Sequence, residues 1–222
     1  AEHHLIVAHE VINEGHDRSQ LTPMAQLTQE TLQSADLKVL ADRGYFSGEE
    51  IMKCEQAGVT PLVPKPLTNN AATTGRFDKR DFHYDAKRDR YICPAGEQAI
   101  WRFTSIQNGM AIRKYWSSAC PKCAIRSDCT TSDYRRLMRW EHEAVIERMQ
   151  QRLDRMPQAG RLRRQTVEHT FGTLKSWMGA THFLTKRLPG VRTEMSLQVL
   201  AYNLKRVMQI MGVQPLIAAM RA

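Results

Sequence analysis

Asp42 is the first residue whose type and position suggest chemistry. It follows an apolar run at residues 37–41 and precedes Gly44, which lets the backbone turn sharply. In open parallel sheets, ligand-binding groups gather beyond the C-terminal ends of the strands, so a carboxylate here can project into a cleft. A helix-capping or turn aspartate is the alternative interpretation.

Glu168 is the second candidate. In an expected helix, Arg164 lies four residues before it and Lys175 seven residues after it, so the three side chains share one face. Such a face suits a site that holds both metal ions and phosphates, because the carboxylate binds Mg2+ and the cations bind phosphate. An ordinary ion pair on a solvated helix is the alternative. His169 points about 100° away from this face and is given no role.

Four cysteines, Cys93, Cys120, Cys123 and Cys129, follow the spacing C-x26-C-x2-C-x5-C. The tight turn between Cys120 and Cys123 can direct two thiolates at one tetrahedral ion, and the other two cysteines complete a closed set of ligands. We therefore expect a structural Zn2+. An iron–sulfur cluster, reduced thiols in a small core and disulfides formed after isolation are the alternatives. The isolated Cys54 is expected in the core.

The elements that position Asp42 read as alternating strands and helices. Apolar runs predict strands at 5–11, 37–41 and 59–63, and helical spacing predicts helices at 21–33 and 48–57. Asp17 or Ser19 is expected to cap the first helix, and Ser47 the second. Strand–helix–strand order implies parallel pairing through crossover helices, so the expected fold class is α/β.

The pattern changes beyond residue 66. Short strands around Tyr84 and Tyr91 indicate a small β insertion that holds the cysteines, and helical spacing returns at 135–155, 161–177 and 191–211. The last helix is expected to present Leu197, Leu200 and Leu204 on one apolar face. Three parts follow: 1–66 with the α/β sheet, 67–134 with the cysteine-rich insertion, and 135–222 as a helical part that carries Glu168.

The charge balance favours a polyanionic partner. The chain has 32 Lys+Arg against 23 Asp+Glu, a formal charge of +9, and each phosphate that a cation neutralises releases condensed counterions. The run from Arg161 to Arg164 has no acidic neighbour before Glu168 and is the better candidate for phosphate contact. Neither a membrane-spanning run nor a signal peptide is seen, and the cysteine usage is typical of a cytoplasmic protein.

Several segments together resemble bacterial insertion-sequence transposases of the DDE class, in the group with a cysteine-containing insertion. The most specific are Asp42-Arg43-Gly44-Tyr45-Phe46 and the helix that contains Val167-Glu168-His169-Thr170-Phe171. The resemblance covers essentially the whole chain. It implies an RNase H-like sheet with flanking helices, of which residues 1–66 would be a partial core.

The resemblance also implies DNA strand cleavage and strand transfer that depend on Mg2+ or Mn2+. Three carboxylates hold two metal ions in such enzymes. Asp42 matches the second carboxylate and Glu168 the third, while Arg164 and Lys175 match the basic partners of the signature. Arg161 stands where the signature has a tyrosine. The expected partners are transposon-end and target DNA, with a homo-oligomer as a further possibility.

The first carboxylate of the family has no match in this sequence. The strand at 5–11 looks like the third strand of the family's sheet, so the first aspartate would precede residue 1, and Asp17 reads as a helix cap instead. The chain is therefore expected to be an inactive fragment of a transposase. A non-catalytic DNA-binding or assembly module derived from a transposase is the alternative function.

Overall fold

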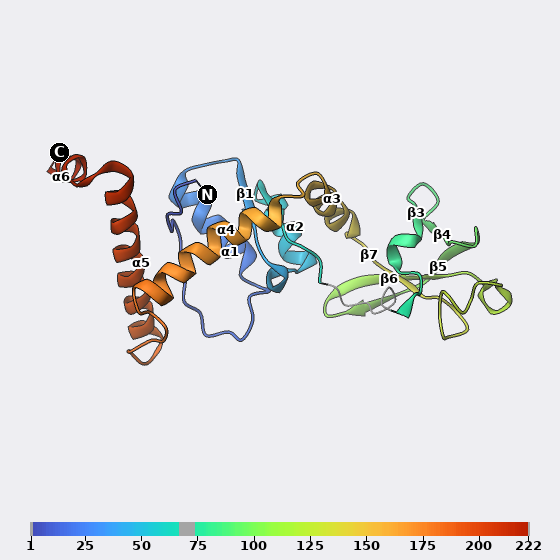
Figure 1. Cartoon of the computed structure of the whole chain (residues 1–222). Coiled ribbons are helices and arrows are strands. Elements are labelled where there is room, and N and C mark those ends of the chain that lie inside the picture. Colours follow the sequence, from blue (N-terminus) through green and yellow to red (C-terminus); the bar gives the residue numbers. More distant parts are fainter. Residues whose placement is uncertain (1, 67–73, 222) are drawn as a thin grey trace. The chain divides into compact units, whose positions relative to one another are not determined.

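The computed structural model describes residues 2–66 and 74–221, and its chain forms two compact units (Figure 1). The first unit contains Ala1–Lys65 and Arg148–Ala222, and the second contains Pro66–Glu147. The chain is mixed α/β: a small parallel sheet and most of the helices belong to the first unit, and a five-stranded antiparallel sheet to the second.

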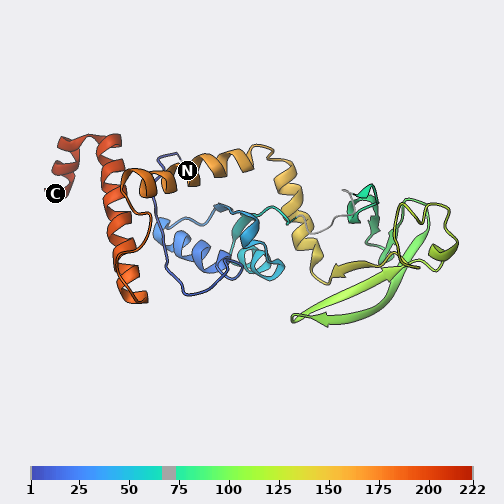
Figure 2. The same ribbon diagram turned by 60° about the horizontal axis from the view of Figure 1, so that its bottom comes forward.

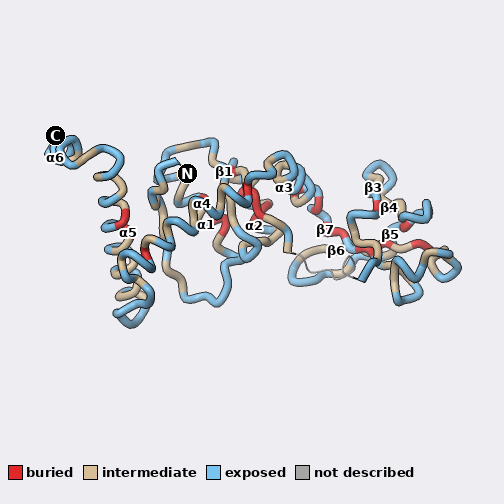
Figure 3. Tube along the Cα trace, viewed as in Figure 1, coloured by how far each residue is buried: buried red, intermediate tan, exposed pale blue. Residues whose placement is uncertain are grey.

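The first unit contains the predicted parallel strands and their crossover helix. Strand β1 (Leu37–Leu40) pairs in parallel with β2 (Val59–Leu62), and α2 (Gly48–Gln56) connects them after the short helix η1 (Arg43–Tyr45). Helix α1 (Leu21–Leu32) precedes β1. The core between these elements is apolar and includes Cys54, as expected; its most buried members are Leu21, Ala25, Ile51, Cys54, Val59 and Val63 (Figure 3).

The capping predictions for the two helices have different outcomes. Ser47 caps α2, since its Oγ accepts the Glu50 N–H at 3.5 Å, so that prediction is confirmed. The prediction for α1 is wrong: its cap is Gln20, which makes no side-chain cap hydrogen bond. The Ser19 hydroxyl instead donates to the Glu14 carboxylate at 2.8 Å, so a local carboxylate competes successfully for it.

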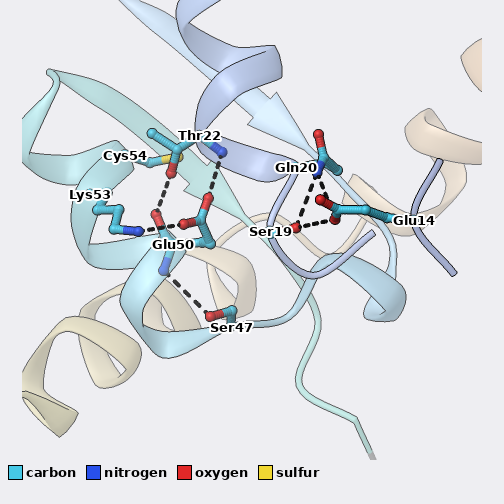
Figure 4. A network of polar contacts seen from close by, with 8 residues as sticks. All are labelled: Glu14, Ser19, Gln20, Thr22, Ser47, Glu50, Lys53 and Cys54. Atoms are coloured by element: carbon cyan, nitrogen blue, oxygen red, sulfur yellow. Dashed lines mark hydrogen bonds and ion pairs between the residues drawn. The ribbon is translucent and has the colours of Figure 1, made fainter. Parts of the chain in front are cut away.

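Glu50 holds α1 against α2 (Figure 4). Its carboxylate accepts the Thr22 N–H at 3.0 Å, its backbone carbonyl accepts the Thr22 hydroxyl at 3.2 Å, and Lys53 pairs with it at 2.8 Å. The side chain is buried. Burial acts to raise the pKa of Glu50, but the hydrogen bonds from Lys53 and Thr22 outweigh burial and the pKa is lowered.

The predicted strand at 5–11 is wrong. The segment has no strand hydrogen bonds in the structure, and side chains of α5 (Leu188–Met211) satisfy part of its backbone instead. Asn203 accepts the Ile6 N–H at 2.9 Å and donates to the Ile6 carbonyl at 2.7 Å. The Tyr202 hydroxyl donates to the His4 carbonyl at 2.7 Å. The β-branched residues of segment 5–11 therefore do not form a strand, because the segment has no sheet partner among the described residues.

The second unit is a five-stranded antiparallel sheet in the order β3-β4-β5-β6-β7. Its strands are β3 (His83–Asp85), β4 (Arg90–Ile92), β5 (Gln98–Gln107), β6 (Met110–Trp116) and β7 (Leu137–Trp140). Figure 2 shows β5 and β6 as a long hairpin in green. The core on one face is formed by Phe82, Tyr91, Ala99, Tyr115 and Leu137.

The predicted helix at 135–155 is wrong in its first part. Residues Leu137–Trp140 form β7, and helix α3 (Glu143–Asp154) begins only afterwards. Along β7, Leu137, Arg139 and Trp140 are buried, and Met138 is 52% exposed. The segment is a strand because it pairs with β6, and the predicted helical spacing missed it because Arg139 is an unusual core residue.

The C-terminal part is helical, as predicted, with different boundaries. Helix α4 (Ala159–Gly172) continues into a π-helical stretch, η5 (Thr173–Trp177), and α5 is followed by α6 (Val213–Arg221), which was not predicted. The expected apolar face of α5 is largely exposed, with Leu197 at 61% and Leu200 at 62%, whereas Val199 and Tyr202 are buried. None of the described helices has both the length and the apolar character that crossing a bilayer requires.

Candidate functional site

Asp42 stands directly beyond the C-terminal end of β1, where the sequence predicts it. It is exposed and begins η1, with its Oδ1 accepting the Gly44 N–H at 2.8 Å. A Cβ atom at position 44 would lie 3.0 Å from the same oxygen, so glycine is what allows this close approach. The turn thus fixes the orientation of the carboxylate, and Oδ2 makes no hydrogen bond to the described residues.

A second carboxylate, Asp17, lies within electrostatic reach of the same turn. The pKa of the Tyr45 hydroxyl is raised, first by burial and then by the negative charges of Asp17 and Asp42. Asp17 is not the side-chain cap of α1 that the sequence predicts, because that cap position belongs to Gln20.

Glu168 lies in an open hollow on α4, of about 500 Å³. The hollow is lined by Arg161, Arg164, Gln165, Glu168 and His169. All five stand on one helical face, because positions separated by three, four, seven and eight residues recur on the same side of a helix. The structure therefore brings together three residues singled out from the sequence: Arg161, Arg164 and Glu168.

The charged groups of this hollow do not pair with one another. No hydrogen bond or ion pair to a described residue occupies the Glu168 carboxylate or the guanidinium groups of Arg161 and Arg164. The alternative of an ordinary Arg164–Glu168 ion pair is therefore not what the structure contains. An exposed carboxylate beside two free guanidinium groups can receive a cation and a phosphate at the same place.

Lys175 does not line the hollow. Its ammonium lies 5.9 Å from the ring centroid of Phe171. The π-helical stretch Thr173–Trp177 explains the difference, since the change from i→i+4 to i→i+5 hydrogen bonding shifts the following side chains around the axis. The spacing of seven residues between Glu168 and Lys175 holds for a regular α-helix only.

Sequence reasoning missed one residue of the hollow, Gln165, and was wrong to place His169 away from it, because His169 lines the hollow. Both could have been found by extending the face of Arg161 by four and eight positions. The His169 ring lies 5.0 Å from the ring of His4. Thr170, one residue further, contacts the hydroxyl of the buried Tyr202 at 3.3 Å, which links α4 to α5.

The four clustered cysteines line one cavity of about 30 Å³ in the second unit. Its other lining residues are apolar ones together with Glu97, Ser117, Arg126, Thr130 and Arg135. All four are free thiols, and the short helix η4 (Cys120–Lys122) forms the predicted turn between two of them. Burial, first, and the other three thiols raise the pKa of Cys129, while Arg135 opposes them. Four sulfurs facing one small cavity fit the ligand chemistry of Zn2+.

Neither the carboxylates nor the cysteines are arranged as a complete set of metal ligands among the described residues. Among the described residues, no three His, Cys, Asp or Glu side chains lie close enough to share one ion. Asp42 is outside the hollow of Glu168. The donor types fit their metals at both places, with hard carboxylate oxygens for Mg2+ and thiols for Zn2+.

A family model described as Transposase DDE domain matches residues 92–208, more than half of the chain. The matched span begins in β4 and includes the cysteine cluster and the hollow of Glu168. It does not include Asp42. No curated protein and no solved structure matches the chain significantly.

Proposed function

The chain belongs to the DDE transposase domain family, and on that premise we propose that it serves DNA transposition by metal-dependent DNA strand cleavage and strand transfer. The family itself implies a function related to transposition, DNA binding and the use of a divalent metal. Our proposal assigns these to residues. Asp42 and Glu168 are the second and third carboxylates of the site, in the remains of an RNase H-like sheet.

The hollow of Glu168 is the observation that carries this proposal. One exposed face of α4 carries the Glu168 carboxylate and the guanidinium groups of Arg161 and Arg164. None of these three groups has a hydrogen-bond or ion-pair partner among the described residues. Buried or structural ion pairs elsewhere in the chain satisfy their charges, as Glu55 does with Arg148 and Arg152. Charges left open to solvent on one face are available for a ligand that brings both a cation and phosphates.

The residues have separate tasks in the proposed reaction. Glu168 and Oδ2 of Asp42 would hold Mg2+ or Mn2+, while the hydrogen bond from Gly44 fixes the Asp42 carboxylate. The metal supplies activation of the attacking hydroxyl and stabilisation of the leaving oxygen. Arg161 and Arg164 hold the phosphate of the DNA backbone by charge-assisted hydrogen bonds. Lys175 would contact DNA outside the hollow, beside Phe171.

We also propose that Cys93, Cys120, Cys123 and Cys129 hold one structural Zn2+. The support is their common cavity and the tight turn at η4. To bind the ion, the four thiolates would have to close around it from the cavity that all four line. The ion would stabilise the sheet next to it, because Cys93 and Cys129 pack against its core.

One observation favours a second function, that of a non-catalytic DNA-binding or assembly module. Asp42 does not line the hollow of Glu168, so the structure does not bring the two matched carboxylates into one hollow. We expect the chain alone not to nick supercoiled plasmid DNA in Mg2+ or Mn2+. Nicking that disappears in Glu168→Ala would contradict this expectation and show that two carboxylates suffice.

The DNA-binding part of the proposal is tested by the salt dependence of duplex binding. If Arg164 contacts one phosphate, Arg164→Gln reduces the slope of log K against log salt by about 0.9. Arg161→Gln is expected to act in the same way. Arg163→Gln is the matched control, since Arg163 is on the same helix and does not line the hollow. Equal slopes for the Arg163 and Arg164 variants would overturn the assignment.

A further inference from the structure

One face of the sheet in the second unit packs on the core. The other face is open around Phe103 and Met138, while Trp140 farther along the same face is buried. Residues directly opposite each other on neighbouring strands share a face. Tyr115 is opposite Leu137, and both are in the core. The next pairs along the strands are on the other face: Phe103 is opposite Lys114, Lys114 is opposite Met138, and Ile100 is opposite Trp116.

The open face exposes large apolar side chains that a soluble sheet usually covers. Ile100 is 43% exposed, Phe103 45% and Met138 52%. Trp116 is half-buried, and its ring meets that of Phe103 edge-on at 6.0 Å between centroids. These two rings form the centre of what we call the stacking face, defined as Arg102, Phe103, Lys114, Trp116 and Arg136.

The cations of the stacking face lie over its aromatic rings. The Arg102 guanidinium is 5.5 Å from the ring centroid of Trp116, and the Arg136 guanidinium is 5.9 Å from the same ring. The Lys114 ammonium is 5.2 Å from the ring of Phe103. Alternating cations and rings at these distances form cation–π contacts, which keep the charges beside the flat surface.

Arg102 owes its place to an irregularity of the strand. The register of β5 against β6 shifts between Trp101 and Phe103, which leaves Arg102 as the extra residue of a bulge. Its side chain donates to the Trp116 carbonyl at 3.3 Å and to the Ser118 hydroxyl at 2.6 Å. The bulge and these two hydrogen bonds therefore hold the Arg102 guanidinium over the Trp116 ring.

The charges of the stacking face have no carboxylate partners. Within the described part of the chain, Arg102, Lys114 and Arg136 form no ion pair. Other arginines of the same sheet do, as Arg113 with Asp89 at 3.1 Å and Arg139 with Glu147 at 2.5 Å. A polyanion would supply the missing negative charge.

Asp85 is a carboxylate on the same side of the sheet, as the register of β3 and β4 shows. It is already paired with Arg88 at 3.4 Å and Arg90 at 3.2 Å. Its charge is therefore balanced locally. The positive charge of the stacking face remains uncompensated.

We propose that the stacking face binds single-stranded DNA, with unpaired bases on Phe103 and Trp116 and phosphates on Arg102, Lys114 and Arg136. The inference rests on the proposed function only in taking DNA as the polymer. A sheet face with accessible rings and with cations that have no carboxylate partner suits unpaired bases, because each base offers a π-face and each phosphate a charge. Duplex DNA keeps its base faces stacked internally, so it meets the cations alone.

The test is the affinity of the full chain for a fluorescein-labelled oligothymidine of about 16 nucleotides, compared with a duplex of equal length. Fluorescence anisotropy is measured without Mg2+ or Mn2+, so cleavage plays no part. We expect the single strand to bind at least about tenfold more tightly than the duplex. Phe103→Leu keeps an apolar side chain but removes the ring, and should raise the Kd for the single strand about five-fold to a hundred-fold.

Matched variants separate the stacking face from other features. Ile106→Ala alters a side chain of the same strand that is 70% exposed and outside the stacking face, and should leave the Kd unchanged. Arg136→Gln should weaken binding, and Lys122→Gln, an exposed cation of the same unit, should not. Circular dichroism checks that each variant keeps its fold.

Several results would overturn the inference. Equal affinity for single strand and duplex would do so, as would an unchanged Kd in both Phe103→Leu and Arg136→Gln. Self-association of the chain that Phe103→Leu abolishes would assign the face to a protein contact instead. If Arg164→Gln abolishes single-strand binding while Phe103→Leu leaves it unchanged, the strand binds at the hollow and not at the stacking face.

Discussion

At the scale of single residues, the two proposed ligands are held in different ways. Asp42 is fixed by its turn, while Glu168 stands free in a hollow. Residue types and spacing predicted both positions correctly on their elements, because the end of an apolar strand and the face of a helix are local properties. They could not predict where Lys175 points, since nothing in the sequence announces a π-helical stretch.

Gly44→Ala tests how Asp42 is held. The new Cβ would lie 3.0 Å from Oδ1, so the carboxylate has to shift and its hydrogen bond lengthens. We expect a loss of about 1 kcal/mol in the free energy of unfolding and weaker Mn2+ binding by calorimetry. Gly160→Ala is the control, because no atom comes within 4 Å of a Cβ built there. Unchanged Mn2+ affinity in Gly44→Ala would argue against Asp42 as a ligand.

At the scale of elements, the helices and strands with strong local signals were predictable. The pair β1 and β2 with α2 between them appears as expected, including the cap at Ser47. Segment 5–11 and β7 were not, because their state depends on partners distant in sequence. The backbone of segment 5–11 hydrogen-bonds to a side chain of α5 and not to another strand. Strand β7 forms because it pairs with β6.

The contact between α1 and α2 should depend on pH through Glu50. Its folded pKa lies below the usual 4.5, so its stabilising effect is present above about pH 4.5 and is lost as the pH falls through the folded pKa. Glu50→Gln should lower the free energy of unfolding by about 1 to 2 kcal/mol at neutral pH. In urea titrations this difference should shrink in acid. Glu49→Gln, exposed in the same turn, should show neither effect.

The cysteine cavity is also a feature of elements, because residues of η4 and residues of the sheet line it together. We expect about one Zn2+ per chain in elemental analysis of protein purified without added metal. Cys120→Ser with Cys123→Ser should abolish it and destabilise the second unit, whereas Cys54→Ala should retain the ion. Finding neither zinc nor iron would contradict a metal at the cysteines, and iron in place of zinc would favour an iron–sulfur cluster.

At the scale of the whole molecule, charge is the property that the sequence predicts best. A formal charge of +9 indicated a polyanionic partner, and the structure places unpaired cations at two places, the hollow of Glu168 and the stacking face. The first was expected from the run Arg161 to Arg164. The second was not, because it depends on a strand register and a bulge that composition does not reveal.

Glu168 is the central metal ligand of the proposed site, and Mn2+ binding to the full chain in complex with a short DNA duplex tests this role directly. Isothermal titration calorimetry should show binding that Glu168→Gln weakens at least about tenfold, since the charge and number of carboxylate ligands set the affinity. Glu30→Gln removes an exposed helical carboxylate of the same unit and should have no effect. Equal Mn2+ affinity in the wild-type chain and Glu168→Gln would contradict the proposed site.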